Sequence, residues 1–187
     1  MELKQAIFGR RAVRVFTSQS VDDITLRTLI DSAVQAPSAV NAQPWMFCVV
    51  RDRAVLDEIS RKAKLFNLAT TPAGLLSHHF EQLLSDPQFD IFYHAPVLIL
   101  ICSNRQSPWA VEDCALAAQN LMLSAYAAGL GTCWVGFAQK WLETSEAKSL
   151  LQLPPECQPV APIIVGHPQA TVAPVLREIP NIRWVGA

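Results

Sequence analysis

The stretch Pro96-Val97-Leu98-Ile99-Leu100-Ile101-Cys102 is apolar at every position. Neighbouring side chains of a strand point to opposite faces of a sheet, so this run predicts a central strand that is covered on both sides. A long helix is expected next, with Ser107 as its cap, Pro108 in its first turn and Gly129 at its end. Few polar residues interrupt that helix, and we expect it to be buried nearly all round.

Further strands and helices are predicted on either side of this unit, from apolar runs and from apolar residues at helical spacing. The expected strands cover residues 46–50, 132–137 and 162–166. The expected helices cover residues 21–36, 53–64 and 142–151, with Ser20 capping the first. No Gly-x-Gly-x-x-Gly is present, so a dinucleotide-binding Rossmann fold is not supported.

Two segments have weaker patterns. Residues 65–92 include a helical patch at 75–84 but no clean apolar period, which fits ordinary packing under a loop or a mobile cover over a pocket. Residues 182–185 have the pattern of one more strand, in this chain or paired with a partner.

Length and composition favour one domain over residues 1–187, with a core that needs no metal or disulfide. Charged residues make up 17% and apolar residues 51% of the chain. A small monomer does not easily hide so much apolar surface, so a homodimer interface, a bound cofactor or both are expected. The net charge of -1 provides no broad basic field for nucleic acid.

The first residues lack the apolar run of a signal peptide, and no segment reaches the length of a membrane span. We therefore expect a cytoplasmic protein with no membrane partner. The cysteines form no Cys-x-x-Cys pair and are expected to be reduced core thiols, with no metal site: Cys48, Cys102, Cys114, Cys133 and Cys157.

Three arginines stand within five residues in Arg10-Arg11-Ala12-Val13-Arg14-Val15-Phe16. A guanidinium is a planar fork of donors that matches phosphate oxygens, so the cluster predicts a site for a small anion. Basic clusters are also common on protein surfaces. For the arginines taken alone, a solvated turn before a helix is the commoner explanation.

A polar loop lies between two prolines in Ala36-Pro37-Ser38-Ala39-Val40-Asn41-Ala42-Gln43-Pro44-Trp45. Its hydroxyl and carboxamide groups offer the alternating donors and acceptors that complement the polar edge of a flavin ring. They also suit a loop whose polar groups bind its own backbone. The loop alone does not decide between these two explanations.

These two segments resemble motifs of the nitroreductase family of FMN-dependent oxidoreductases. So do Gly129-Leu130-Gly131-Thr132-Cys133-Trp134-Val135-Gly136 and Val165-Gly166-His167-Pro168, the latter followed by Arg177. Their order and spacing fit along nearly the whole chain. The resemblance implies an α+β fold with a mainly antiparallel central sheet flanked by helices. It also implies an intertwined homodimer with two FMN sites at its interface.

The resemblance assigns the FMN phosphate to Arg10 and Arg11 of one subunit, with Arg177 returning to it near the carboxyl terminus. Arg14 would lie towards N1 and O2 of the ring. Ala12 stands where the family usually has serine or threonine. One hydroxyl contact to FMN is thereby lost, which costs about 1 kcal/mol of binding free energy.

The same resemblance assigns the cover of the cofactor to the loop of the other subunit. Pro37, Ser38 and Asn41 would contact the cofactor, with Gln43 nearby. The strand Cys133-Trp134-Val135-Gly136 would run along the ring and bring a backbone N–H to N5.

The activity implied is an NAD(P)H-dependent reduction of nitroaromatics, quinones or similar electron-poor small molecules. Hydride would pass from NADH or NADPH to N5 of FMN, and the acceptor would follow in a ping-pong cycle. No protein nucleophile or acid–base residue is required, and Arg14 is the candidate for stabilising negative charge on the ring. Two alternatives stay open: a non-catalytic flavin-binding or storage protein, and a specialised relative such as a reductive dehalogenase.

Overall fold

The computed structural model describes residues 1–72, 74–75 and 77–186. Its sheet is built around β2 (Val97–Ser103), which is buried at every position. β2 lies between β1 (Trp45–Val50) and β4 (Gln158–Gly166), and β3 (Gly131–Trp134) pairs with the other side of β4. All three pairings are antiparallel, which confirms both the central strand and the mainly antiparallel sheet.

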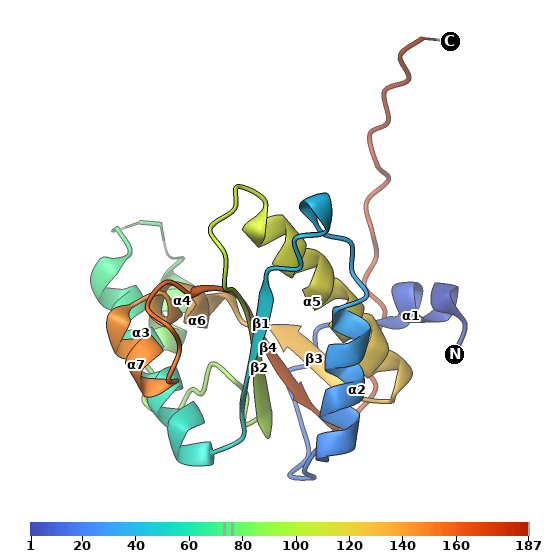
Figure 1. Cartoon of the computed structure of the whole chain (residues 1–187). Helices are drawn as coiled ribbons and strands as arrows, with labels where there is room; N and C mark the ends of the chain where they lie inside the picture. The colour runs from blue at the N-terminus through green and yellow to red at the C-terminus, as the bar shows by residue number, and fades with distance from the viewer. Residues whose placement is uncertain (73, 76, 187) are drawn as a thin grey trace.

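Alternate residues of β2 point into two cores, one on each face of the sheet. Val97, Ile99 and Ile101 pack with residues of α2 (Asp23–Ala33) and α5 (Ala110–Ala127). Leu98, Leu100 and Cys102 pack with residues of α3 (Arg53–Thr70) and the other helices of the opposite layer. The sheet is therefore flanked by helices on both faces, as Figure 1 shows. The α+β fold implied by the resemblance is confirmed.

The remaining elements are shorter, and they are α1 (Leu3–Gly9), the 3-10 turn η1 (Ala39–Asn41), α4 (His78–Ser85), α6 (Gly136–Leu142) and α7 (Ser145–Leu150). α4, α6 and α7 lie in the layer of α3, whereas α1 contacts α5 (Figure 1). None of the described helices is long and apolar enough to span a membrane.

Two predicted helix starts are wrong. α2 is capped by Asp22, not by Ser20, because the Asp22 carboxylate accepts a hydrogen bond from the Thr25 amide at 2.8 Å. α5 begins at Ala110, three residues after Ser107. The Ser107 hydroxyl instead accepts from the Trp109 amide in the preceding turn.

The region after β3 also differs from the prediction. The strand expected over 132–137 ends at Trp134, and the chain turns at once into α6. The helix expected over 142–151 is only α7, which is capped by Thr144. α1 was not predicted, and α3 continues to Thr70 instead of ending at 64.

The outer face of α5 and the carboxyl-terminal tail are more exposed than expected. Val111 and Leu116 on α5 are each 46% exposed, so the expectation of a helix buried nearly all round is wrong for a single chain. Residues 171–186 contain no helix or strand, including the predicted strand at 182–185, and all are exposed. The tail extends away from the body of the chain in Figure 1.

Candidate functional site

The arginine segment lies along the outer strand of the sheet. Ala12 forms a parallel bridge with Thr132 of β3, and the Val13 amide donates to the Thr132 carbonyl at 2.9 Å. A Cβ atom at Gly131 would lie 2.8 Å from the Val13 side chain, so this close approach requires glycine. The side chains of Arg10 and Arg14 are thereby held next to β3.

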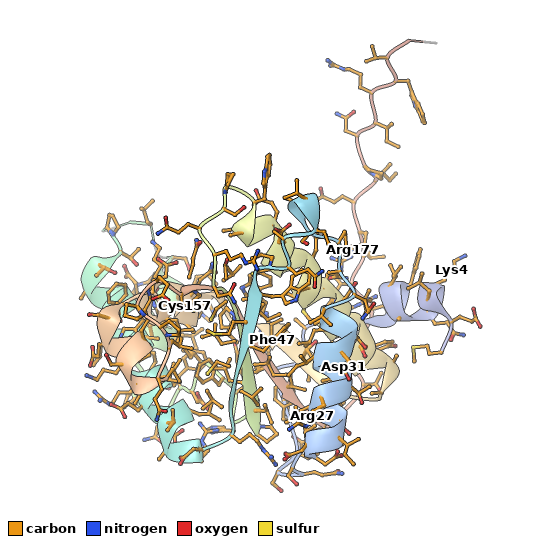
Figure 2. The ribbon with its side chains drawn as sticks, in the orientation of Figure 1. Lys4, Arg27, Asp31, Phe47, Cys157 and Arg177 are labelled. Carbon is orange, nitrogen blue, oxygen red and sulfur yellow. The ribbon has the colours of Figure 1, made fainter. Side chains whose placement is uncertain are left out.

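Guanidinium groups gather beside Cys133. Burial lowers the pKa of Arg10, and the nearby charges of Arg11 and Arg177 lower it further. Burial raises the pKa of the Cys133 thiol, and the charges of Arg14 and Arg10 oppose part of that rise. Figure 2 shows Arg177 near the point where the tail leaves the body of the chain.

No carboxylate balances this cluster. Among the residues that the structure describes, none of the four arginines forms an ion pair with an aspartate or glutamate: Arg10, Arg11, Arg14 and Arg177. Like charges placed together repel one another, so an anion bound among them would stabilise the arrangement. A cavity of about 290 Å³ opens beside Arg10 and Arg11 and is also lined by Thr132 and Tyr126.

The guanidinium of Arg11 forms hydrogen bonds within its own chain. Its Nη1 donates to the carbonyls of Phe8 at 2.8 Å and Arg10 at 2.7 Å, at the carboxyl-terminal end of α1. Its Nε is buried and has no partner in the described part of the chain. The Nη1 group of Arg11 therefore binds the last carbonyls of α1. Within the described residues Arg10 has no such bond from its guanidinium, so its donors remain available to an anion.

Tyr93 lies against Arg14 and was not found from the sequence. The guanidinium carbon of Arg14 is 5.9 Å from the centre of the Tyr93 ring, which is cation–π distance. Burial raises the pKa of the Tyr93 phenol, and the charge of Arg14 opposes that rise. Tyr93 has φ 53°, in a turn built by Asp90, whose carboxylate accepts from the Phe92 and His94 amides at 2.9 Å. Nothing in the sequence pattern connects Tyr93 with a residue 79 positions earlier.

The end of β3 presents one exposed backbone amide. The Val135 amide donates to the Pro162 carbonyl at 2.9 Å, so it is used within the sheet. Within the described residues the next amide, that of Gly136, has no acceptor, and Gly136 is exposed at the start of α6. Cys133 is buried and Trp134 is half-buried. Gly136 is thus an exposed member of the predicted strand whose N–H has no acceptor in the described residues.

The loop from Pro37 to Pro44 has an unusual backbone. Val40, Asn41 and Gln43 have φ values of 49°, 56° and 47°, a region that non-glycine residues seldom occupy and that costs of order 1–3 kcal/mol each. The Ser38 hydroxyl accepts from the Gln43 amide at 3.0 Å, and the Asn41 carboxamide accepts from Gln43 Nε2 at 2.9 Å. The loop therefore satisfies part of its own polar groups, as one of the two sequence-based explanations expects.

In one chain, this loop and Arg10 lie at opposite ends of α5. The Ala39 amide binds Asp113 in the first turn of α5, whereas Gly9 and the arginine cavity border Tyr126 in its last turn. Tyr126 follows Asp113 by thirteen positions along the helix, a rise of about 20 Å. The structure thus brings Arg10, Arg14, Arg177 and Cys133 together, but it does not bring the loop to Arg10.

The family model described as "Nitroreductase family" matches residues 7–167. The chain belongs to the nitroreductase family. A "Putative NADH dehydrogenase/NAD(P)H nitroreductase" of Methanothermobacter thermautotrophicus is 30% identical over 173 residues, which cover 90% of this chain and 78% of the relative. An "FMN reductase (NADPH)" of Bacillus subtilis is 26% identical over 172 residues, with 88% of this chain and 65% of the relative covered.

Two solved structures share the fold of this chain. A nitroreductase from Bacteroides fragilis, solved with bound FMN, superposes with a TM-score of 0.86 over the full length of both chains at 22% identity. A nitroreductase with bound FMN from Desulfitobacterium hafniense has a TM-score of 0.83 at 23% identity, also over both full chains. The family resemblance stated from the sequence motifs is confirmed.

Proposed function

We propose that this member of the nitroreductase family is an FMN-dependent oxidoreductase that uses NADH or NADPH to reduce nitroaromatics, quinones or similar electron-poor small molecules. The observation that carries the proposal is the cluster of Arg10, Arg14 and Arg177 beside β3, which has no carboxylate partner in the described chain. The names of the relatives, an NAD(P)H nitroreductase and an NADPH-dependent FMN reductase, support the choice of cofactor and reductant.

The residues present fit the phosphate of FMN. Arg10 and Arg177 are close enough for the charge of one to lower the pKa of the other, and a dianion between them would turn that repulsion into attraction. Arg11 donates instead to the Phe8 and Arg10 carbonyls at the end of α1. Ala12 is half-buried in this segment and brings no hydroxyl group.

The chain's own residues would bind and orient the ring. Arg14, held against Tyr93, would place positive charge at the N1 and O2 edge and favour electron density there. The free amide of Gly136 would donate a hydrogen bond to the ring from the end of β3, beside Cys133, Trp134 and Val135. When bound, FMN supplies the hydride chemistry that links oxidation of the nicotinamide to reduction of the acceptor in two half-reactions.

We also propose that residues 1–187 form one domain that works as a homodimer. The loop residues Pro37, Ser38, Asn41 and Gln43 would then cover the cofactor held by the arginines of the other copy, because about 20 Å of α5 separates them from Arg10 of their own chain. The exposed apolar residues of α5 and of the tail support such an interface, since large exposed apolar surfaces mark association sites.

The test is anaerobic reduction of the FMN-loaded protein by NADH and by NADPH, followed by addition of single acceptors. We expect NADH, NADPH or both to bleach the flavin absorbance. Addition of a nitroaromatic or a quinone should then restore it. A flavin that stays oxidised with both nicotinamides would contradict the proposal. Binding of FMN without steady-state turnover over the whole acceptor panel would favour a flavin-binding or storage protein instead.

A further inference from the structure

Asp113 is a buried acid that touches the loop expected to cover the cofactor. Its side chain projects inward from the first turn of α5, and the residue is 3% exposed. Oδ1 accepts a hydrogen bond from the Ala39 amide at 2.9 Å. Oδ2 is buried and has no partner within the described residues. A buried carboxylate is costly unless it is hydrogen-bonded, so a position that keeps one needs a specific reason.

The loop has few ties to the rest of the chain. Between residues 39 and 44, two hydrogen bonds to residues outside the loop are present in the described structure. One runs from the Ala39 amide to Asp113, and the other runs from the Asn104 amide to the Pro44 carbonyl at 2.8 Å. Between these two anchors Val40 is 98% exposed, so packing does not hold its side chain in place, and Ala42 is only half-buried.

The backbone between the two anchors has a conformation that is intrinsically unfavourable for its residues. Three of its residues, Val40, Asn41 and Gln43, have φ between 47° and 56°. Side chains other than glycine are disfavoured in this region, and a β-branched residue such as Val40 most of all. The tie from Asp113 to Ala39, directly before the first of these residues, therefore adds to the loop's own hydrogen bonds in keeping it from relaxing.

We infer that Asp113 is a positioning residue that holds the loop of residues 38–43 in the shape that covers the cofactor of the other copy. This inference rests on the proposed function, because the proposed function supplies the cofactor that the strained loop would cover. Stabilisation of the α5 start by an acidic side chain does not explain Asp113. The adjacent Glu112 is exposed and provides the same negative charge in the same turn without burial.

Three variants separate the hydrogen bond from the rest of the residue. Asp113→Asn keeps the volume and a carbonyl that accepts from the Ala39 amide, and Asp113→Leu keeps the branching at Cγ but is larger and has no acceptor. Glu112→Leu is the matched control in the same turn. Each is measured by amide hydrogen exchange of residues 38–43 and of β2, and by titration of the ligand-free protein with FMN.

We expect Asp113→Leu to raise exchange of the loop amides at least tenfold, with β2 unchanged, and to raise the dissociation constant for FMN at least tenfold. Asp113→Asn should recover most of both effects, within about threefold of the parent protein, because a neutral acceptor forms a weaker bond than a charged one. Glu112→Leu should leave both unchanged. Rescue by asparagine but not by leucine, with the exchange of β2 unchanged in both, indicates loss of the acceptor and not a general disturbance of packing.

Parent-like loop exchange in Asp113→Leu would overturn the inference, as would faster exchange with unchanged affinity for FMN. If Asp113→Leu does not fold, Asp113→Ala replaces it, because alanine also lacks an acceptor for the Ala39 amide. A rise in loop exchange together with a rise in the FMN dissociation constant supports the inference, and no change in either overturns it. Failure of the parent protein to bind FMN would instead refute the proposed function, while the exchange of residues 38–43 would still report whether Asp113 holds the loop.

Discussion

Arg10→Ala is expected to weaken the binding of FMN and to leave the binding of riboflavin unchanged. Riboflavin has the same ring as FMN and lacks the phosphate, so the two ligands together isolate the phosphate contact. A hydrogen bond between charged groups contributes about 1.5–3 kcal/mol, and each 1.4 kcal/mol changes a dissociation constant about tenfold. Because Arg10 is only half-buried, we expect the lower part of that range, a rise of roughly 10–30-fold for FMN.

Arg11→Ala is the matched control, since it removes an equal charge from the next residue. Its Nη1 donates to the Phe8 and Arg10 carbonyls, so its loss should lower the free energy of unfolding by about 1–2 kcal/mol. That corresponds to a melting temperature lower by about 2–8 °C for a chain of this size. Arg10→Ala should instead leave the melting temperature of the ligand-free protein unchanged or higher, because it relieves repulsion from Arg11 and Arg177.

The assay is titration of ligand-free protein with FMN and riboflavin at one fixed ionic strength, since salt screens such contacts. Arg177→Ala, like Arg10→Ala, should weaken the binding of FMN and not of riboflavin. Arg11→Ala should change the ratio of the FMN affinity to the riboflavin affinity by less than about threefold. Equal loss of FMN and riboflavin binding in Arg10→Ala would show that the residue does not act on the phosphate. A selective loss in Arg11→Ala alone would assign the phosphate to Arg11 and refute the reasoning from its bonds to α1.

Three further predictions concern single residues around the same site. Ala12→Ser should restore a hydroxyl group and tighten FMN binding by about fivefold, measured by titration, because one hydrogen bond contributes about 1 kcal/mol; unchanged affinity would mean that this hydroxyl does not face the cofactor. Tyr93→Leu should free Arg14 and lower the two-electron potential of bound FMN by about 10–20 mV, from a cation–π energy of about 0.5–1 kcal/mol, whereas Tyr93→Phe should keep the parent potential within error. Asp90→Asn should lower the free energy of unfolding at pH 7 and make that free energy fall less steeply in acid. The measurement is urea unfolding at several pH values from pH 7 to pH 2. Burial would raise the pKa of Asp90, but hydrogen bonds from Phe92, His94, Ser60 and Arg53 bring it below its ordinary value. The stability that Asp90 contributes is therefore complete above about pH 4 and is lost as the pH falls through the lower, folded pKa; an equally steep acid loss in Asp90→Asn would show that other groups control it.

The layers of the fold were predictable because hydrophobic pattern determines which faces are buried. The run that ends at Cys102 alternates between two cores, and a sequence apolar at every position is what such a strand needs. Helix starts were less predictable, because Ser20 and Asp22 are both good caps and only the geometry of the Thr25 amide decides between them. α6 was missed because Thr132 to Phe137 reads as one apolar run, although the chain leaves the sheet after Trp134.

The candidate site was predictable in its motifs and not in its contacts. Arg10, Arg11 and Arg14 were singled out because three guanidinium groups in five residues are chemically distinctive. Tyr93 and Asp113 were not, because a tyrosine and an aspartate are distinctive only through what they touch. Arg14 and the Ala39 amide lie 79 and 74 positions away from them. Such contacts depend on the packing of whole elements, which local pattern does not contain.

The length of α5 keeps the two motifs apart within one chain. The helix is continuous from Ala110 to Ala127 and ends where Gly129 adopts φ 77°. Its rise per residue is fixed, so Asp113, which binds the loop, and Tyr126, which borders the arginine cavity, lie about 20 Å apart along the helix axis. In the proposed homodimer, a two-fold axis would bring the loop end of each α5 to the arginine end of the other, and the two motifs would meet only across the two copies.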